Sequence, residues 1–257
     1  MRTRCSSRIG TYVVIDMFKR TQNEYAVITS YPKATGKDLL KWRPPIATAG
    51  TGIVAICKTK QLAGNYMFKH DRGHFIENPG KPVLTPFFAA GMACFGYWNR
   101  FSFSKGHRLL AIPTDPYLPY LFDGEEILMS LRLWTFGYDL YLPDTDVIYH
   151  IYEQYYKRPL FWNDDWNIQK KTAVRTAQNW INYVLQLYEK YPKRGQLDVR
   201  EIDKYGLGKE RDPAQFWKWI DYDFQKMESP EFCNLLKKEG FERVPINSDL
   251  AKNIHLL

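Results

Sequence analysis

Three carboxylates lie beside one glycine near the middle of the chain, in the run Asp123-Gly-Glu-Glu126. The apolar residues of 127–134 recur at helical spacing, so the acids are predicted to lie at a helix start, where the helix dipole favours negative charge. Two interpretations follow. In the first, the acids face water and only stabilise the first turn. In the second, Asp123, Glu125 and Glu126 form part of a polar pocket that orients a sugar hydroxyl, a metal ion or an attacking alcohol.

Several segments around these acids stand in an order that carries a family resemblance. They are Phe101-Ser-Phe-Ser-Lys-Gly-His107, the stretch from Asp115 to Glu126, Ile148-Tyr-His-Ile-Tyr152, Arg158-Pro159 with Phe161-Trp162, and Tyr205-Gly-Leu-Gly-Lys-Glu-Arg211. Each is weak alone, but the ordered set resembles the N-acetylglucosaminyltransferases whose best-known member modifies hydroxyproline on a ubiquitin-ligase subunit. The resemblance covers about residues 12 to 225. It implies a GT-A fold and a metal-dependent, retaining transfer from a nucleotide sugar, typically UDP-GlcNAc.

The resemblance also implies roles for single residues. Glu125 and Glu126 occupy the family's Gly-Glu-Glu position, which faces the transferred sugar and the acceptor hydroxyl, and Asp123 stands beside them. His150 matches the histidine after the next strand, which resembles the third protein ligand of the divalent cation.

A second group of residues is predicted to hold the donor. Ser104, Lys105 and His107 fall in the family's Ser-Phe-Ser-(Arg/Lys)-Gly-His stretch, where this chain has lysine in place of the commoner arginine. Lys105, His107 and Arg158 are therefore the candidate donor-binding residues, with Lys105 and Arg158 assigned to the diphosphate on charge alone.

The residue types fit this chemistry. As a nucleotide sugar breaks, charge develops on the diphosphate, and a bound Mn²⁺ or Mg²⁺ with nearby Lys or Arg stabilises it. These ions prefer carboxylate oxygens with one imidazole, and a neutral His150 at the end of the strand-like residues 146–150 fits that set. Without the resemblance, a solitary histidine between Tyr149 and Ile151 is more typical of a half-buried strand residue.

The chain departs from the family at its front. Members carry an Asp-any residue-His metal motif and a nucleotide-binding half before the matched region, whereas this chain opens Met1-Arg-Thr-Arg. We find no substitute acid pair near the front, and Asp144-Thr-Asp146 is interpreted as a turn. The chain is thus predicted to be truncated at its N-terminus. The alternative function is that of a catalytically inactive relative that acts as a binding or scaffold module.

The composition of the chain limits the classes of molecule that it is expected to bind. The formal charge is +8, but Lys and Arg are spread along the chain without a long basic run, which argues against a nucleic-acid partner.

The longest apolar stretch, residues 86–98, is too short to cross a bilayer, and no signal peptide is visible. The expected partners are a nucleotide sugar and a protein acceptor with a hydroxyl side chain. The expected location is cytoplasmic, or the Golgi if an N-terminal anchor has been lost.

The four cysteines, at positions 5, 57, 94 and 233, show no CxxC spacing. Neither a zinc site nor a disulfide framework is indicated, so reduced thiols are expected. Cys57 and Cys94 lie in apolar surroundings and are interpreted as small buried hydrophobes.

The patterning that must position these residues predicts an α/β fold: a GT-A-like mixed sheet flanked by helices, with a helical C-terminal part. Residues 1–225 are assigned to one partial glycosyltransferase domain, and residues 226–257 to a C-terminal helix and charged tail. The main expected elements are a strand at 25–31, a β-rich segment at 51–59, a buried strand within 83–98, a helix capped by Asn163 or Asp164 that extends to Pro192, and a helix that starts at Asp212-Pro213.

Overall fold

The structure is a computed structural model that describes residues 8–34, 52–89, 101–150, 168–193, 195–238 and 240–246. Its centre is a four-stranded mixed sheet with the strand order β7-β9-β1-β8. These strands are β1 (Ala26–Ser30), β7 (Val83–Thr85), β8 (Phe101–Phe103) and β9 (Asp139–Leu142). β1 and β9 run parallel, and the two outer strands run antiparallel to them.

Both faces of the central strands are covered by packed side chains. Every residue of β1 and β9 is buried, as expected for strands between two layers. Alternate residues of β1 point to opposite faces, so Val27 packs with Met129 and Leu133 of helix α3 (Glu125–Thr135), whereas Ile28 packs near Phe18 of helix α1 (Arg8–Arg20). The predicted mixed sheet flanked by helices is confirmed.

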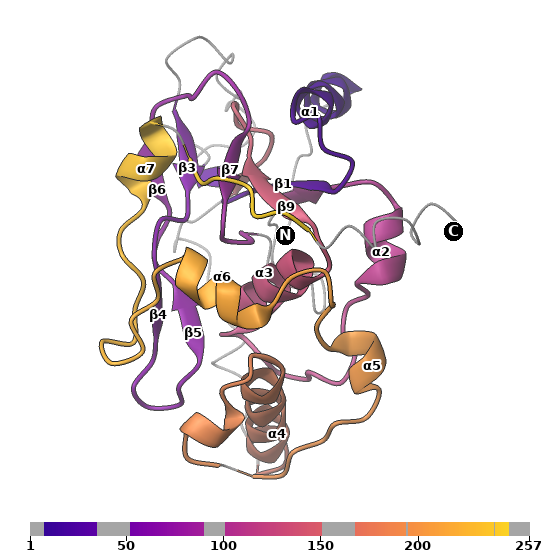
Figure 1. The fold of residues 1–257 in the computed structure, drawn as a ribbon, viewed down its shortest axis with the longest axis vertical. Coiled ribbons are helices and arrows are strands. Elements are labelled where there is room, and N and C mark those ends of the chain that lie inside the picture. The colour runs from indigo at the N-terminus through magenta and orange to yellow at the C-terminus, as the bar shows by residue number, and fades with distance from the viewer. Residues whose placement is uncertain are drawn as a thin grey trace.

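Helix α3 lies between the sheet and the C-terminal helices (Figure 1). All of its residues are buried, because it contacts β9 on one side and helices α4 and α6 on another. The helical C-terminal part that the sequence predicts is also confirmed. It comprises α4 (Ile168–Val184), the 3₁₀ helix η2 (Tyr188–Lys190), α5 (Ile202–Tyr205), α6 (Pro213–Trp219) and α7 (Cys233–Lys238).

Three two-stranded ladders complete the described fold. β3 (Ile53–Ala55) pairs with β6 (His74–Ile76), β4 (Thr59–Gln61) pairs with β5 (Phe68–His70), and β2 (Lys33–Ala34) pairs in parallel with β10 (Tyr149–His150). A short helix α2 (His107–Ala111) follows β8. In β2, Lys33 and Ala34 pair with residues that lie more than a hundred positions away in the chain.

Other boundaries differ in detail from the sequence expectations. The Asp212-Pro213 cap is confirmed, because the Asp212 carboxylate accepts a hydrogen bond from the Ala214 amide at 2.8 Å. The predicted buried strand at 83–98 forms a strand only at β7 among its described residues. Helix α4 ends at Val184, earlier than predicted, and its expected caps at positions 163 and 164 lie outside the described residues.

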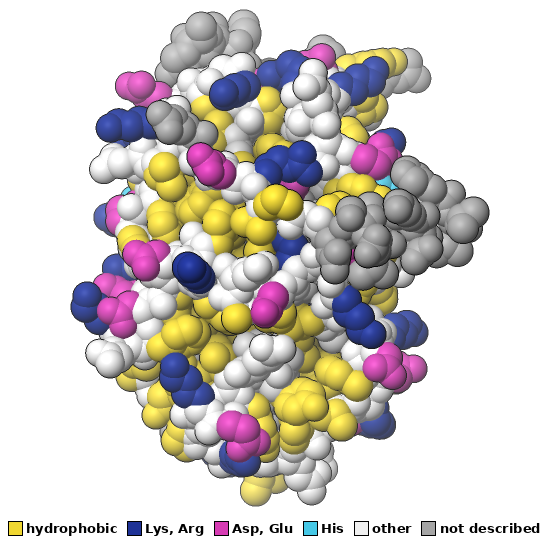
Figure 2. All heavy atoms as spheres, in the orientation of Figure 1, with side chains coloured by type: hydrophobic (Ala, Val, Ile, Leu, Met, Phe, Trp, Pro, Cys, Tyr) yellow, Lys and Arg dark blue, Asp and Glu magenta, His cyan; other side chains and the backbone are white. Residues whose placement is uncertain are grey.

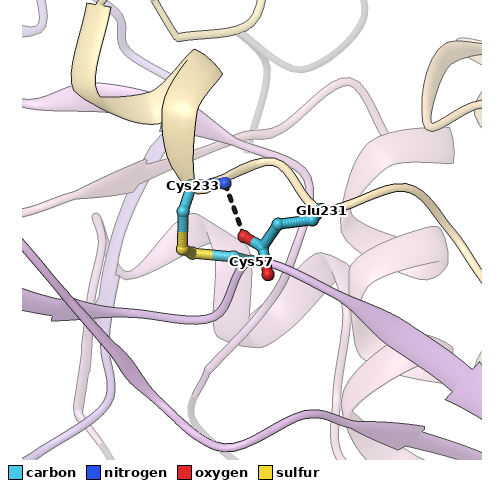
Figure 3. Close-up of side chains that lie close together, drawn as sticks. All are labelled: Cys57, Glu231 and Cys233. Atoms are coloured by element: carbon cyan, nitrogen blue, oxygen red, sulfur yellow. Dashed lines mark hydrogen bonds between the residues drawn. A yellow bond between two sulfur atoms is a disulfide. The ribbon is translucent and has the colours of Figure 1, made fainter.

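The expectation of reduced thiols is wrong for one pair. Cys57 and Cys233 are joined by a disulfide, with their Cα atoms 5.0 Å apart, in the usual range for such a bond (Figure 3). Cys57 is fully buried, as predicted, but it is bonded to Cys233. The sequence does not reveal this pair, because the two cysteines are 176 positions apart in the chain.

The surface offers no concentrated basic face in the view of Figure 2, where Lys and Arg side chains alternate with Asp and Glu. Among the described helices, none combines the length and the apolar character that crossing a membrane requires.

Candidate active site

The acidic couplet begins helix α3 because Gly124 turns the chain there. Gly124 has φ +99°, a conformation that side-chain-bearing residues rarely adopt, and it stands as the N-cap before Glu125. A Cβ at this position would lie 3.2 Å from a methyl group of Ile181 and 3.3 Å from the sulfur of Met67. Both the backbone angle and the close packing therefore require glycine at the entry to the helix.

Glu125 and Glu126 are buried, with 9% and 7% of their surfaces exposed. This excludes the simpler interpretation, in which both acids face water. Buried carboxylates are costly unless they have polar partners, and Asp123, Glu125 and Glu126 all have interaction partners. Burial of both acids agrees with the second interpretation, and their roles towards a sugar, a metal ion or an alcohol stay predictions.

Hydrogen bonds connect the first turn of α3 to the sheet. The Ser130 hydroxyl donates to the Glu126 carbonyl at 2.7 Å and accepts from the Phe88 amide at 2.8 Å. The next amide, that of Ala89, donates to the Thr29 hydroxyl of β1 at 3.0 Å. Residues 88 and 89 thus hold the start of α3 in a fixed relation to the end of β1.

The acidic couplet lies at one end of α3, and strand β9 follows the other end. Strands β1 and β9 are parallel, and β2, which follows β1 in the chain, pairs in parallel with β10, which follows β9. At the other end of α3, Gly137 (φ +84°) reverses the chain, and the Tyr138 amide bonds to the Leu133 carbonyl before β9 begins. The length of α3 thus separates the couplet from β9, and the shared site of the couplet and His150 stays a prediction.

Two predicted site residues are not described at side-chain level. His150 is placed by its backbone in β10, opposite Ala34, and its side chain lies outside the described part of the structure. Arg158 lies outside the described residues altogether. The metal role of His150 and the diphosphate role of Arg158 stay predictions.

Lys105 and His107 lie at the opposite end of α3. The Lys105 ammonium pairs with the Glu24 carboxylate, and His107 Nδ1 lies 2.6 Å from the Tyr138 hydroxyl. His107 Nε2 lies 3.5 Å from Glu24. Because the helix covers about 16 Å at 1.5 Å per residue, the structure does not bring this pair together with the acidic couplet. Their predicted role in donor binding stays a prediction.

A buried arginine on the same helix escaped the sequence analysis. Arg132 has no exposed surface, and its guanidinium donates to the carbonyls of Pro113 at 2.9 Å and Gly206 at 3.2 Å. Burial lowers the pKa of Arg132 to about 10, an effect that nearby Asp115 opposes. Pro113 begins the loop that leads to Gly124, so Arg132 fixes that loop to the helix it precedes. In the sequence, Arg132 could have been found as a charged residue inside the otherwise largely apolar run 127–134.

A polar cavity of about 500 Å³ lies elsewhere, between the loop 208–213 and residues Pro245 and Ile246. Its wall includes Lys209, Glu210 and Arg211, and it contains none of the predicted site residues. The predicted carboxylates Glu125 and Glu126 lie at the other end of α3 from this cavity.

Comparison with known protein families identifies the family of the chain. The family model described as "Glycosyltransferase (GlcNAc)" matches residues 11–226. A search of curated proteins finds no match to the chain.

Proposed function

Because this chain belongs to the glycosyltransferase (GlcNAc) family, we propose that it transfers N-acetylglucosamine from UDP-GlcNAc to a hydroxyl side chain of a protein, with retention of anomeric configuration. The observation that supports this most directly is the burial of Glu125 and Glu126, which directly follow Gly124 at the start of α3. Family membership supports glycosyl transfer in general. The identity of the sugar, the identity of the acceptor and the retention of configuration are what we propose beyond family membership.

Glu125 and Glu126 have the chemistry to orient hydroxyl groups. Carboxylates withdrawn from water accept hydrogen bonds that are stronger than those made at an exposed surface. In this proposal one carboxylate accepts from a hydroxyl of the donor sugar and the other from the acceptor hydroxyl, while Asp123 lies at the entrance to the same turn. Holding both reactants in this way lowers the entropic part of the barrier.

The donor set suits a hard divalent cation. Asp123, Glu125 and Glu126 offer carboxylate oxygens, and His150 is the proposed imidazole ligand, in its neutral form. When bound, Mn²⁺ or Mg²⁺ would stabilise the charge that develops on the leaving diphosphate. Lys105, His107 and Arg158 are the proposed protein contacts of the donor.

The test is release and transfer of labelled GlcNAc from UDP-GlcNAc by the purified full chain with Mn²⁺, using peptides that carry serine, threonine or hydroxyproline. We expect turnover that a chelator abolishes and that Glu125→Gln and Glu126→Gln each lower by about 100-fold or more. His150→Ala should raise the Mn²⁺ concentration needed for half-maximal activity.

The matched control is Glu189→Gln, because this glutamate is exposed and pairs only with Lys193 among the interactions seen. It should keep wild-type activity. If the folded wild-type chain shows no metal-dependent turnover, the enzyme proposal fails and the binding-module alternative takes its place. Equal activity of wild type and both glutamine variants would instead remove the acidic couplet from the reaction.

A further inference from the structure

The disulfide between Cys57 and Cys233 joins two distant parts of the chain. Cys57 follows strand β3, and Cys233 is the first residue of helix α7. The family match ends at residue 226, so the bond ties the matched region to the segment that follows it. Figure 1 shows α7 beside β3 and β6, on the flank of the sheet.

The segment 228–246 completes the interior of the molecule. The amide of Ser229 donates to the Thr59 carbonyl at 2.9 Å, and the amide of Phe232 donates to the Cys57 carbonyl at 2.9 Å. Leu236 has 1% of its surface exposed and packs in one apolar cluster with Ile53, Val83 and Leu142. Two of those residues belong to the central sheet, so the segment covers part of the sheet's apolar surface.

The surroundings of the sulfur atoms are those of a structural bond. Cys57 is fully buried, and the Glu231 carboxylate accepts a hydrogen bond from the Cys233 amide at 2.8 Å (Figure 3). That carboxylate lies within 4.8 Å of both sulfur atoms, a spacing that also suits a metal site. Sulfur atoms bonded to each other are not thiolate ligands, however, and burial hinders attack by an external thiol.

We propose that this disulfide forms in the cell, that the chain works in an oxidising compartment, and that the bond clasps residues 228–246 onto the sheet. Closure converts the two thiols into one S–S bond, and their two electrons and two protons pass to a disulfide oxidant that becomes two thiols. Cytosolic thiols are kept reduced, so a buried, fold-completing disulfide favours a secretory or comparable oxidising location over the cytoplasmic location expected from the sequence.

The compartment is tested on the full chain taken from the cells that naturally produce it. Free thiols are blocked with N-ethylmaleimide at lysis, and peptides are then mapped without reduction. We expect a linked peptide pair that contains Cys57 and Cys233. Recovery of both residues in the blocked, unlinked form would overturn the proposal.

The clasp is tested by reducing the purified chain with dithiothreitol and confirming the cleavage by peptide mapping. We expect the melting temperature to fall by roughly 5–15 °C, as loss of a long-range disulfide implies for a chain of this size. Hydrogen exchange at the amides of Ser229, Phe232 and Phe241 should accelerate at least tenfold, while that of Val27 in β1 stays slow.

Two cysteine variants serve as controls. C57S/C233S should match the reduced wild type with or without dithiothreitol, whereas C5S/C94S should keep the full response. If the first variant does not fold, the reduced wild type still gives the answer. Unchanged melting and exchange after proven cleavage would refute the clasp. None of these measurements uses transfer activity, so the outcome is independent of the proposed function.

Discussion

Asp139, the first residue of β9, is a buried acid whose carboxylate has three polar partners. Its carboxylate accepts hydrogen bonds from Arg211 at 2.9 Å, from Arg243 at 2.8 Å and from the side-chain amide of Asn23 at 2.8 Å. Arg211 is 1% exposed at its side chain, whereas Arg243 is 53% exposed. Loss of the buried ion pair should therefore lower the free energy of unfolding more than loss of the exposed one.

We predict that Asp139→Asn lowers the free energy of unfolding by about 3–5 kcal/mol, because it leaves the buried Arg211 without a counter-charge. Arg243→Gln should cost no more than about 1 kcal/mol, since solvent screens an exposed partner. Urea denaturation of the two variants beside the wild type measures both values. Asp198→Asn, which removes an ion pair with a largely exposed Arg200, is the control and should show no measurable loss. Equal losses for Asp139→Asn and Arg243→Gln would contradict this assignment.

For single residues, the sequence indicates a site when the neighbouring residues in the chain form a recognisable pattern. Glu125 and Glu126 stand out because a glycine, a helical pattern and a family motif coincide at one place. Asp139 and Arg132 do not stand out, because their partners are far away in sequence: Arg211 is 72 residues from Asp139, and Gly206 is 74 from Arg132. Only the folded chain brings such charges together.

The stability of helix α3 depends on Gly124, the residue that caps its N-terminus. We predict that Gly124→Ala costs about 1–3 kcal/mol of stability, because alanine is strained at φ +99° and its methyl group would press on Ile181 and Met67. Transfer activity should fall as well, since Glu125 and Glu126 follow directly. Thermal unfolding and initial rates measure the two effects.

The control for this substitution is Gly64→Ala. Gly64 has no left-handed φ, and a Cβ there meets no atom within 4 Å. Its stability should stay within about 0.5 kcal/mol of the wild type. A Gly124→Ala variant as stable and active as Gly64→Ala would show that the helix does not need its glycine entry.

Element prediction succeeded where local chemistry decides the outcome. The β1 strand, the α3 start and the Asp212 cap all follow from propensity, periodicity or capping within a few residues. The β2–β10 pairing was missed, because a two-residue strand has no periodicity to read. Its partners, Lys33 and Tyr149, are 116 residues apart.

For the whole molecule, buried tyrosines make stability sensitive to alkali. Burial raises the pKa of Tyr149 to about 12 and raises the pKa values of Tyr138 and Tyr222 as well. In the unfolded chain these phenols ionise near pH 10, so between about pH 10 and 12 the folded state binds more protons. Stability should therefore be fully present below pH 10 and fall as the pH rises further.

Arg132 acts in the opposite direction. Its lowered pKa means that the folded chain loses that proton first, which favours folding as the pH rises from about 10 to 12.5. One arginine is outweighed by three tyrosines, so the net effect is destabilising. Urea midpoints at pH 8, 9.5, 10.5 and 11 test this, and a constant midpoint would contradict it. Tyr138→Phe should flatten the decline, whereas Tyr12→Phe, at an exposed position, should not.

The disulfide between Cys57 and Cys233 determines where the chain can be shortened without loss of the fold. A shortened version that stops at residue 226, where the family match ends, would lack Leu236 and uncover the apolar flank formed by Ile53 and Val83. It would also carry an unpaired sulfhydryl at position 57. We expect such a fragment to precipitate or to form intermolecular dimers, so the smallest stable unit extends beyond the region that the family shares.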